Sequence, residues 1–233
     1  RHLSRDTRNI ESVKGLVVGN VQSGKTANMA ALIAMAADNG WNMFVILSGM
    51  MNNLRIQTQK RLWNDLSSGE CKWDWHIIDN PRPVEEAGRK LRDLQLSTES
   101  RRRYIAVCLK NSTRLSNIID WLAYDKASRE NVRMLIIDDE ADQASINTSQ
   151  DDRTTINKLI LNLINNRDSK SRNISSKIQG INYIGYTATP YANVLNESPG
   201  KESLYPSNFL TSLSTSNEYF GPQQIFGYDD GDS

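Results

Sequence analysis

The stretch GNVQSGKT, Gly19 to Thr26, lies directly behind the short apolar run Leu16–Val18. Its spacing, a glycine, four residues and then Gly-Lys-Thr, fits the phosphate-binding pattern G-x-x-x-x-G-K-[ST]. Such a loop needs a strand before it and a helix after it. The β-branched run suits a buried strand, and the Ala- and Met-rich segment Ala27–Gly40 predicts a helix that stops at Asn-Gly. The stretch therefore predicts a phosphate-binding loop in an α/β domain.

Each fixed residue of this loop has a chemical task. Gly19 and Gly24 let the backbone turn its N–H groups toward a β-phosphate. Lys25 would bridge the β- and γ-phosphates, and the Thr26 hydroxyl would hold Mg²⁺. The predicted cofactors are ATP and Mg²⁺. The predicted nucleotide-binding residues are Gly19, Gln22, Ser23, Gly24, Lys25, Thr26 and Ala27.

Composition limits the class of protein. The chain has 233 residues, 38% of them hydrophobic and 24% charged, with a net charge of +1. These values predict a globular protein with a sizeable core. The net charge is too small to attract nucleic acid over the whole surface, so any such contact must come from a local basic patch. Cys71 and Cys108 have no CxxC spacing, which favours a reducing cytoplasm, and no apolar run is long enough to span a membrane. Because the chain begins with Arg1 rather than Met, we expect a piece of a longer protein.

Apolar runs alternate with helical patterns along the chain, which predicts a mostly parallel sheet with helices on both faces. The expected strands are 16–18, 43–47, 76–78, 104–109, 134–137 and 183–186. The expected helices are 27–40, 52–66, 83–95, 113–128 and 156–166. Residues 167–177 read as a mobile surface loop. We expect an NTPase lobe over residues 1–195 and an extended connector over residues 196–233.

The segment MLIIDDEADQAS predicts the second half of the nucleotide site. The buried run Met134–Ile137 ends in Asp138, Asp139 and Glu140. Carboxylates crowded at a strand end repel one another unless a cation lies among them. Two alignments with the motif are possible. If the Mg²⁺ ligand is the first Asp after four apolar residues, it is Asp138. If the motif is the string DEAD, the Mg²⁺ ligand is Asp139 and Glu140 is the catalytic base. We prefer the second alignment, in which Asp138 faces another partner. A solvated acidic turn is the alternative.

A third element follows in YIGYTATPYAN. Thr187 and Thr189 come just after the last apolar strand, and Pro190 ends that strand. We expect the two hydroxyls to hydrogen-bond the carboxylates or to relay the state of the γ-phosphate to a neighbouring domain.

Together these residues resemble helicase superfamily two. GNVQSGKT is similar to its motif I, DEAD at Asp139–Asp142 to motif II and YTATP at Tyr186–Pro190 to motif III, while VILSGMMNNLRIQTQ resembles motif Ia. The combination, together with LYPSNFLTSL and EYFG, is closest to the bacterial Z-one (Z1) domain family, whose members are described as endonucleases. The resemblance extends from about Val17 to Gly227.

The resemblance implies a RecA-like P-loop NTPase lobe, the first of two, in a DNA translocase of bacterial restriction or anti-phage defence. The implied partners are DNA, a second RecA-like lobe and other proteins of defence operons. The chain departs from the pattern because it shows no motif IV, V or VI and no second-lobe arginines. It also shows no D…E-x-K nuclease cluster, so these residues do not account for an endonuclease.

Two loops are candidates for nucleic-acid contact. The motif Ia segment offers Asn53 and Arg55, and the loop after Tyr104–Leu109 offers Lys110 and Arg114. Both loops follow parallel strands and should emerge beside the phosphate loop. Ordinary surface charge remains the alternative for Lys110 and Arg114. The run Arg101–Arg103 lies at the opposite strand end and reads as a solvated turn.

Two other functions compete with the translocase. A nucleotide-gated binding or scaffold module would hold ATP without processive movement along DNA. A small-molecule kinase would also contain a phosphate loop. This hypothesis is disfavoured because the TATP and motif Ia segments would have no role in a kinase.

Overall fold

The computed structural model describes residues 12–20, 24–68, 71–83, 90–97, 99–143, 154–195 and 197–213. Their strands form one sheet with the order β3-β4-β2-β5-β6-β1-β7. Every pairing between these strands is parallel. The strands are β1 (Lys14–Val18), β2 (Met43–Ser48), β3 (Asp74–Ile77), β4 (Arg102–Leu109), β5 (Arg133–Asp139), β6 (Gly180–Thr187) and β7 (Phe209–Ser212). All six strands expected from the sequence are present.

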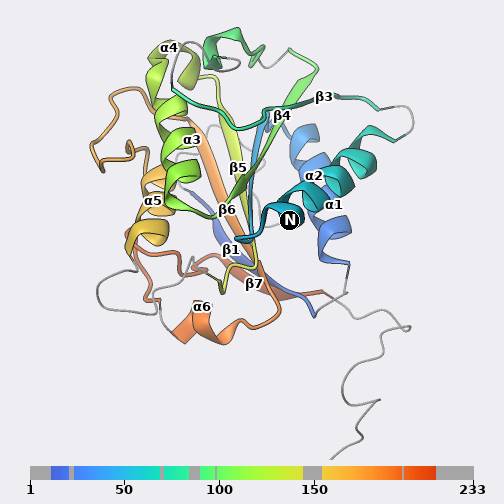
Figure 1. The fold of residues 1–233 in the computed structure, drawn as a ribbon, viewed down its shortest axis with the longest axis vertical. Helices are drawn as coiled ribbons and strands as arrows, with labels where there is room; N and C mark the ends of the chain where they lie inside the picture. The colour runs from blue at the N-terminus through green and yellow to red at the C-terminus, as the bar shows by residue number, and fades with distance from the viewer. Residues whose placement is uncertain are drawn as a thin grey trace, which may run out of the picture.

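Helices cover both faces of the sheet (Figure 1). They are α1 (Lys25–Asp38), α2 (Asn52–Ser67), the 3-10 helix η1 (Leu91–Asp93), α3 (Ser112–Tyr124), α4 (Lys126–Arg129), α5 (Thr154–Ile164) and α6 (Tyr191–Leu195).

Alternation along the buried strands divides the core into two layers. In β2, Met43, Val45 and Leu47 face the layer of α3 and α5. Phe44 and Ile46 face the layer of α1 and α2. The predicted α/β class, with a parallel sheet between two helical layers, is confirmed.

Strand β7 lies in the segment that we expected to be a connector. It pairs with β1 along Gly15–Val18, at the edge of the sheet. The ring of Phe209 occupies the space beside Gly15, where a Cβ atom would overlap it. Residues 209–212 of the expected connector therefore contribute to the sheet, and residues 214–233 lie outside the described residues.

Two helix predictions change in the structure. The expected helix 113–128 is broken at Asp125, whose carboxylate accepts a hydrogen bond from Ser128 N (3.3 Å) and begins α4. Of the expected helix 83–95, residues 84–89 lie outside the described part and Leu91–Asp93 form only a 3-10 turn.

The expected surface loop 167–177 has five exposed residues and is also hydrogen-bonded to neighbouring elements. Ser169 donates from N and Oγ to the carboxylate of Asp120, at 3.1 and 2.7 Å. Arg129, only 2% exposed, donates from Nε to Ser176 O at 2.8 Å. Its mobility stays a prediction, but part of its polar composition serves internal hydrogen bonds.

The run Arg101–Arg103 is only partly the solvated turn that we expected. Arg101 is exposed. Arg103 is 3% exposed, and its guanidinium lies 3.6 Å from the ring centre of Trp73. Burial lowers the pKa of Arg103. The prediction is wrong for Arg103, since a guanidinium can pack flat against an aromatic ring and lose water.

Both cysteines are free thiols. Cys108 is buried in β4, and burial raises the pKa of its thiol to about 12. Among the described residues, none of the helices combines the length and the apolar character that a membrane crossing requires.

Candidate nucleotide site

The candidate site lies where parallel strands end side by side. Strands β1, β5 and β6 are neighbours, and their carboxyl ends lead into the phosphate loop, the DEAD turn and the TATP segment. Gly19 N donates to Thr187 O at 2.9 Å, which joins the start of the loop to the end of β6. Ligands of open α/β sheets bind at this edge.

The loop leads into α1 through Gly24. Its φ of 77° is left-handed, a conformation that glycine adopts without steric cost. Lys25 and Thr26 then open α1, so the N-terminus of a 14-residue helix faces the site with its partial positive charge. Gln22 and Ser23, two of the predicted binding residues, lie outside the described residues.

A cavity of about 580 Å³ joins the two halves of the predicted site. Its lining is Gly24, Lys25, Thr26, Ala27, Arg61, Asp65, Asp139 and Glu140. The phosphate-loop residues and the carboxylates are roughly 110 residues apart in the sequence and follow the predicted order. The fold thus brings together all three predicted catalytic residues, Lys25, Asp139 and Glu140.

Arg61 and Asp65 were missed by the sequence analysis. They lie four residues apart, which places them on one face of α2. That spacing is the only signal the sequence offers. Which face of α2 meets the cavity depends on its packing against α1, so the pair could not be assigned from the sequence.

Asp138 and Asp139 have opposite environments because adjacent strand residues point to opposite faces. Asp138 is fully buried, accepts a hydrogen bond from the Tyr183 hydroxyl (2.7 Å) and lies 3.0 Å from Lys110 Nζ. The prediction that Asp138 faces another partner is confirmed. Asp139 instead lines the cavity.

Burial raises the pKa of Asp139, and the negative charge of Glu140 raises it further. The charges of Lys25 and Lys110 oppose this shift. A desolvated carboxylate beside a second one is a site that a cation would stabilise.

Glu140 adopts an unusual backbone conformation. Its φ of 56° is left-handed, which costs a non-glycine residue about 1–3 kcal/mol. Its carboxylate lies beside Gly49, where a Cβ atom would stand 3.3 Å from Oε2. Strained residues of this kind gather at functional sites, where the surrounding contacts hold them.

The two threonines bind the last carboxylate of the DEAD turn. Thr187 Oγ1 donates to Asp142 Oδ1 at 2.7 Å, and Thr189 Oγ1 donates to Oδ2 at 2.6 Å. Thr189 N also donates to Thr187 Oγ1. The prediction that these hydroxyls hydrogen-bond the carboxylates is confirmed, with Asp142 as the partner. The relay to another domain stays a prediction.

The residues present fit Mg²⁺ together with a phosphate. Magnesium is usually held by one or two carboxylates and by substrate phosphates, with water in the remaining positions. Asp139 and Thr26 line one cavity and supply oxygen ligands of that type. In the described part of the chain, no group of three or more His, Cys, Asp or Glu side chains gathers as a protein-only metal centre.

Lys110 does not lie where we expected. It is fully buried, and its Nζ donates to the carbonyl oxygens of Asp139 (2.8 Å), Glu140 (2.6 Å) and Gln143 (3.0 Å). The prediction of a nucleic-acid contact is wrong for Lys110, because no phosphate can reach a side chain with no exposed surface.

The other nucleic-acid candidates are exposed or half-buried. Asn53 is exposed in the first turn of α2, and Arg114 is half-buried in the first turn of α3. Arg55 is bound to its neighbours, with Nε on Asn52 Oδ1 (3.0 Å) and NH1 on Gln59 Oε1 (3.1 Å). The charges of Arg55 and Arg114 both act on the Cys108 thiol, so the two loops lie beside the end of β4.

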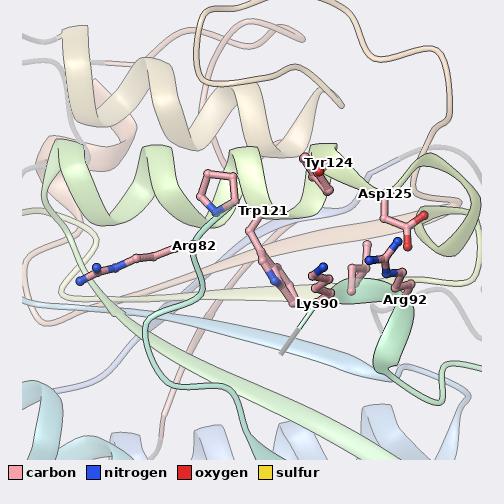
Figure 2. A pocket seen from close by; sticks show the side chains of 8 residues that line it. Arg82, Lys90, Arg92, Trp121, Tyr124 and Asp125 are labelled. Carbon is pink, nitrogen blue, oxygen red and sulfur yellow. The ribbon is translucent and has the colours of Figure 1, made fainter. Parts of the chain in front are cut away.

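A second cavity, of about 140 Å³, is lined by residues of α3 and of the segment around η1 (Figure 2). Its lining is Arg82, Pro83, Lys90, Leu91, Arg92, Trp121, Tyr124 and Asp125. It contains none of the predicted site residues.

Comparisons with known proteins give only distant similarity. No protein family model matches the chain, and no curated protein matches it. One similar solved structure is the DUF1998 helicase MrfA bound to DNA, with 13% identity and a TM-score of 0.45, over 87% of this chain and 25% of the helicase. The chain thus spans a quarter of the length of that relative. Another is Drosophila ORC bound to GC-rich DNA and Cdc6, with 12% identity and a TM-score of 0.26, over 83% of this chain and 60% of that one.

Proposed function

We propose that this chain is the ATP-binding and ATP-hydrolysing lobe, RecA-like in fold, of a helicase-like DNA translocase. One observation carries the proposal. A single cavity at the carboxyl edge of a parallel sheet is lined by Lys25 and Thr26 from the phosphate loop and by Asp139 and Glu140 from the DEAD turn. A phosphate, a divalent cation and a base are the requirements of phosphoryl transfer to water.

In this proposal each side chain has one role. Lys25 and the N-terminus of α1 bind the β- and γ-phosphates, while Thr26 and Asp139 hold Mg²⁺. When bound, the cation neutralises charge on the phosphates. Glu140 orients the attacking water and accepts its proton. The carboxylate of Asp142, bound by Thr187 and Thr189, joins the nucleotide site to the end of β6.

The larger assignment rests on the motif resemblance. The order of motifs I, Ia, II and III supports a superfamily-two motor, in which DNA would cross the loops that carry Asn53, Arg55 and Arg114. The contacts of these loops to the phosphate backbone of DNA would be independent of DNA sequence and sensitive to salt. The same proposal includes a second RecA-like lobe, a cytoplasmic location and partner proteins encoded in a defence operon.

The decisive experiment measures ATP hydrolysis and nucleotide binding by the full protein, with and without DNA. Glu140→Gln should retain Mg²⁺-ATP binding and lose at least about 100-fold in turnover, because an amide cannot accept the proton. Glu99→Gln, an exposed glutamate outside the site, is the matched control. Turnover that survives Glu140→Gln would refute the catalytic assignment. ATP binding without hydrolysis in the wild type would favour the nucleotide-gated module.

A further inference from the structure

The turn that carries the candidate catalytic carboxylates is built around a buried ammonium group. Lys110 leaves the end of β4 and places Nζ beneath the turn, within 2.6–3.0 Å of the carbonyl oxygens of Asp139, Glu140 and Gln143. An ammonium group has three protons to donate, and three carbonyls accept them. The turn is therefore bound through its main chain.

Asp138 balances the charge of this ammonium group. Its Oδ1 lies 3.0 Å from Nζ, which makes the two side chains an ion pair. Its Oδ2 accepts the hydroxyl of Tyr183, which comes from β6. Both partners of the ion pair are fully buried, so the pair is shielded from the screening that weakens surface pairs.

Main-chain bonds from other elements complete the hold on the turn. Ala141 N donates to Tyr186 O at 2.9 Å, and Asn193 Nδ2 of α6 donates to Ala141 O at 3.1 Å. Within this framework, the two bonds to Asp139 O and Glu140 O flank the residue with the left-handed φ of 56°. The lysine therefore binds the main chain on both sides of the Glu140 Cα atom.

We propose that Lys110 is a positioning residue for hydrolysis, which fixes the carboxylate of Glu140 in the cavity by binding the carbonyls of its turn. The inference rests on the proposed function, because Glu140 must be the base for its position to matter. Lys110 touches neither nucleotide nor metal in this account. Its effect should therefore fall on turnover, with nucleotide affinity preserved, since Lys25 and the N-terminus of α1 lie on another element.

The test uses the full protein and removes the charges of Lys110 and Asp138 together. Lys110→Met alone would leave Asp138 buried without its cation and could unfold the chain. The double variant Lys110→Met with Asp138→Asn removes both charges and keeps similar volumes. Lys110→Arg is a second variant that keeps the charge pair but cannot direct three N–H bonds from one nitrogen.

A matched control exists on the strand next to the opposite edge of the sheet. Lys14 at the start of β1 is also buried and also donates to three main-chain carbonyls, those of Gly200, Lys201 and Ser203. Lys14→Met removes a similar set of bonds from a different turn. It should lower thermal stability and leave the turnover of the folded protein unchanged.

The measurements are turnover, equilibrium affinity for Mg²⁺-nucleotide and amide exchange of Ala141 and Gln143. For the double variant and for Lys110→Arg, we expect turnover to fall about 10-fold or more, because a small misplacement of a base is costly. Affinity should change less than about 3-fold, and the two amides should exchange faster.

Wild-type turnover in either folded variant would overturn the inference, as would an equal loss in Lys14→Met. Glu140→Gln separates this result from the larger proposal. If Glu140→Gln itself hydrolyses ATP normally, the proposed function fails. If Glu140→Gln is inactive while the Lys110 variants are active, only the role of Lys110 fails.

Discussion

At the scale of single residues, the pair Asp138 and Asp139 shows how one step along a strand divides two roles. Asp138 is neutralised by Lys110 and bound by Tyr183, so its charge is satisfied inside the fold. Asp139 points into the cavity, where burial and Glu140 raise its pKa. A carboxylate held in that state costs stability until a cation binds, which is a property of a ligand site rather than of a structural residue.

Asp139→Asn should therefore stabilise the nucleotide-free protein and abolish its response to Mg²⁺. Because the folded pKa of Asp139 is raised, the folded state prefers the protonated form, and stability falls as pH rises from the ordinary aspartate value through the raised one. An amide avoids that loss. We expect a gain of about 1 kcal/mol in unfolding free energy at pH 7.

Chemical denaturation at pH 7 and pH 4, with and without Mg²⁺-nucleotide, measures this effect. The gain should shrink at the lower pH, because the raised pKa of Asp139 favours protonation of the wild-type carboxylate as the pH falls. Asp138→Asn is the contrasting variant and should destabilise the protein, since it leaves Lys110 buried without its counter-charge. A destabilised Asp139→Asn protein would contradict the account.

At the scale of elements, the strands were predictable because each buried run was short, β-branched and followed by a turn or a helix. Strand β7 could not be predicted in this way, because its sequence FLTS is short and mostly exposed. It forms a strand through its pairing with β1. The break at Asp125 escaped notice because the helical pattern continues through it. Lys110 was misplaced because KNSTR has the composition of a surface loop, and only tertiary contact with the DEAD turn explains its burial.

The placement of β7 can be tested at Gly15. A Cβ atom there would overlap the ring of Phe209, so Gly15→Ala should cost about 1–3 kcal/mol in unfolding free energy. Combining it with Phe209→Ala should recover part of that cost, since the ring is what the new methyl group meets. A double-mutant cycle by denaturation measures the coupling. Additive effects would show that β7 does not pair over Gly15.

The first turn of α3 carries one of the remaining nucleic-acid predictions, Arg114. Arg114→Ala should weaken binding to duplex and single-stranded DNA about 3- to 10-fold and lower the salt dependence of binding. Arg101→Ala is the control, since Arg101 is exposed at the opposite strand end. Fluorescence anisotropy over a range of salt concentrations gives both quantities. Equal losses in the two variants would indicate a diffuse charge effect rather than a binding loop.

At the scale of the whole molecule, the fold places Lys25, Thr26, Asp139 and Glu140 around one cavity, where we propose a phosphate site, a Mg²⁺ ligand and a base. The sequence predicted that these residues belong together because each lies in a contiguous motif. It could not identify Arg61 and Asp65, which join the cavity through the packing of α2. The account also requires an arginine that neutralises charge on the γ-phosphate, which in related systems is worth about 10³ to 10⁵ in rate.

Residues 1–233 alone should therefore bind nucleotide weakly and hydrolyse it at close to the background rate. DNA should not increase that rate, because half of the expected DNA track belongs to the second lobe. Steady-state hydrolysis by this chain, with and without single-stranded and duplex DNA, measures the prediction. Strong stimulation by DNA would mean that the chain is a self-sufficient NTPase.

The central claim is that the cavity between the phosphate loop and the DEAD turn binds Mg²⁺-ATP. Equilibrium titration of a fluorescent ATP analogue into the wild-type chain, Lys25→Ala and Lys158→Ala tests it most directly. Lys158 is an exposed lysine on α5, across the sheet from the cavity. We predict Mg²⁺-dependent binding that falls at least about 10-fold in Lys25→Ala, with no change in Lys158→Ala and no loss of folding in either. Equal affinity in the wild type and in Lys25→Ala would contradict the claim.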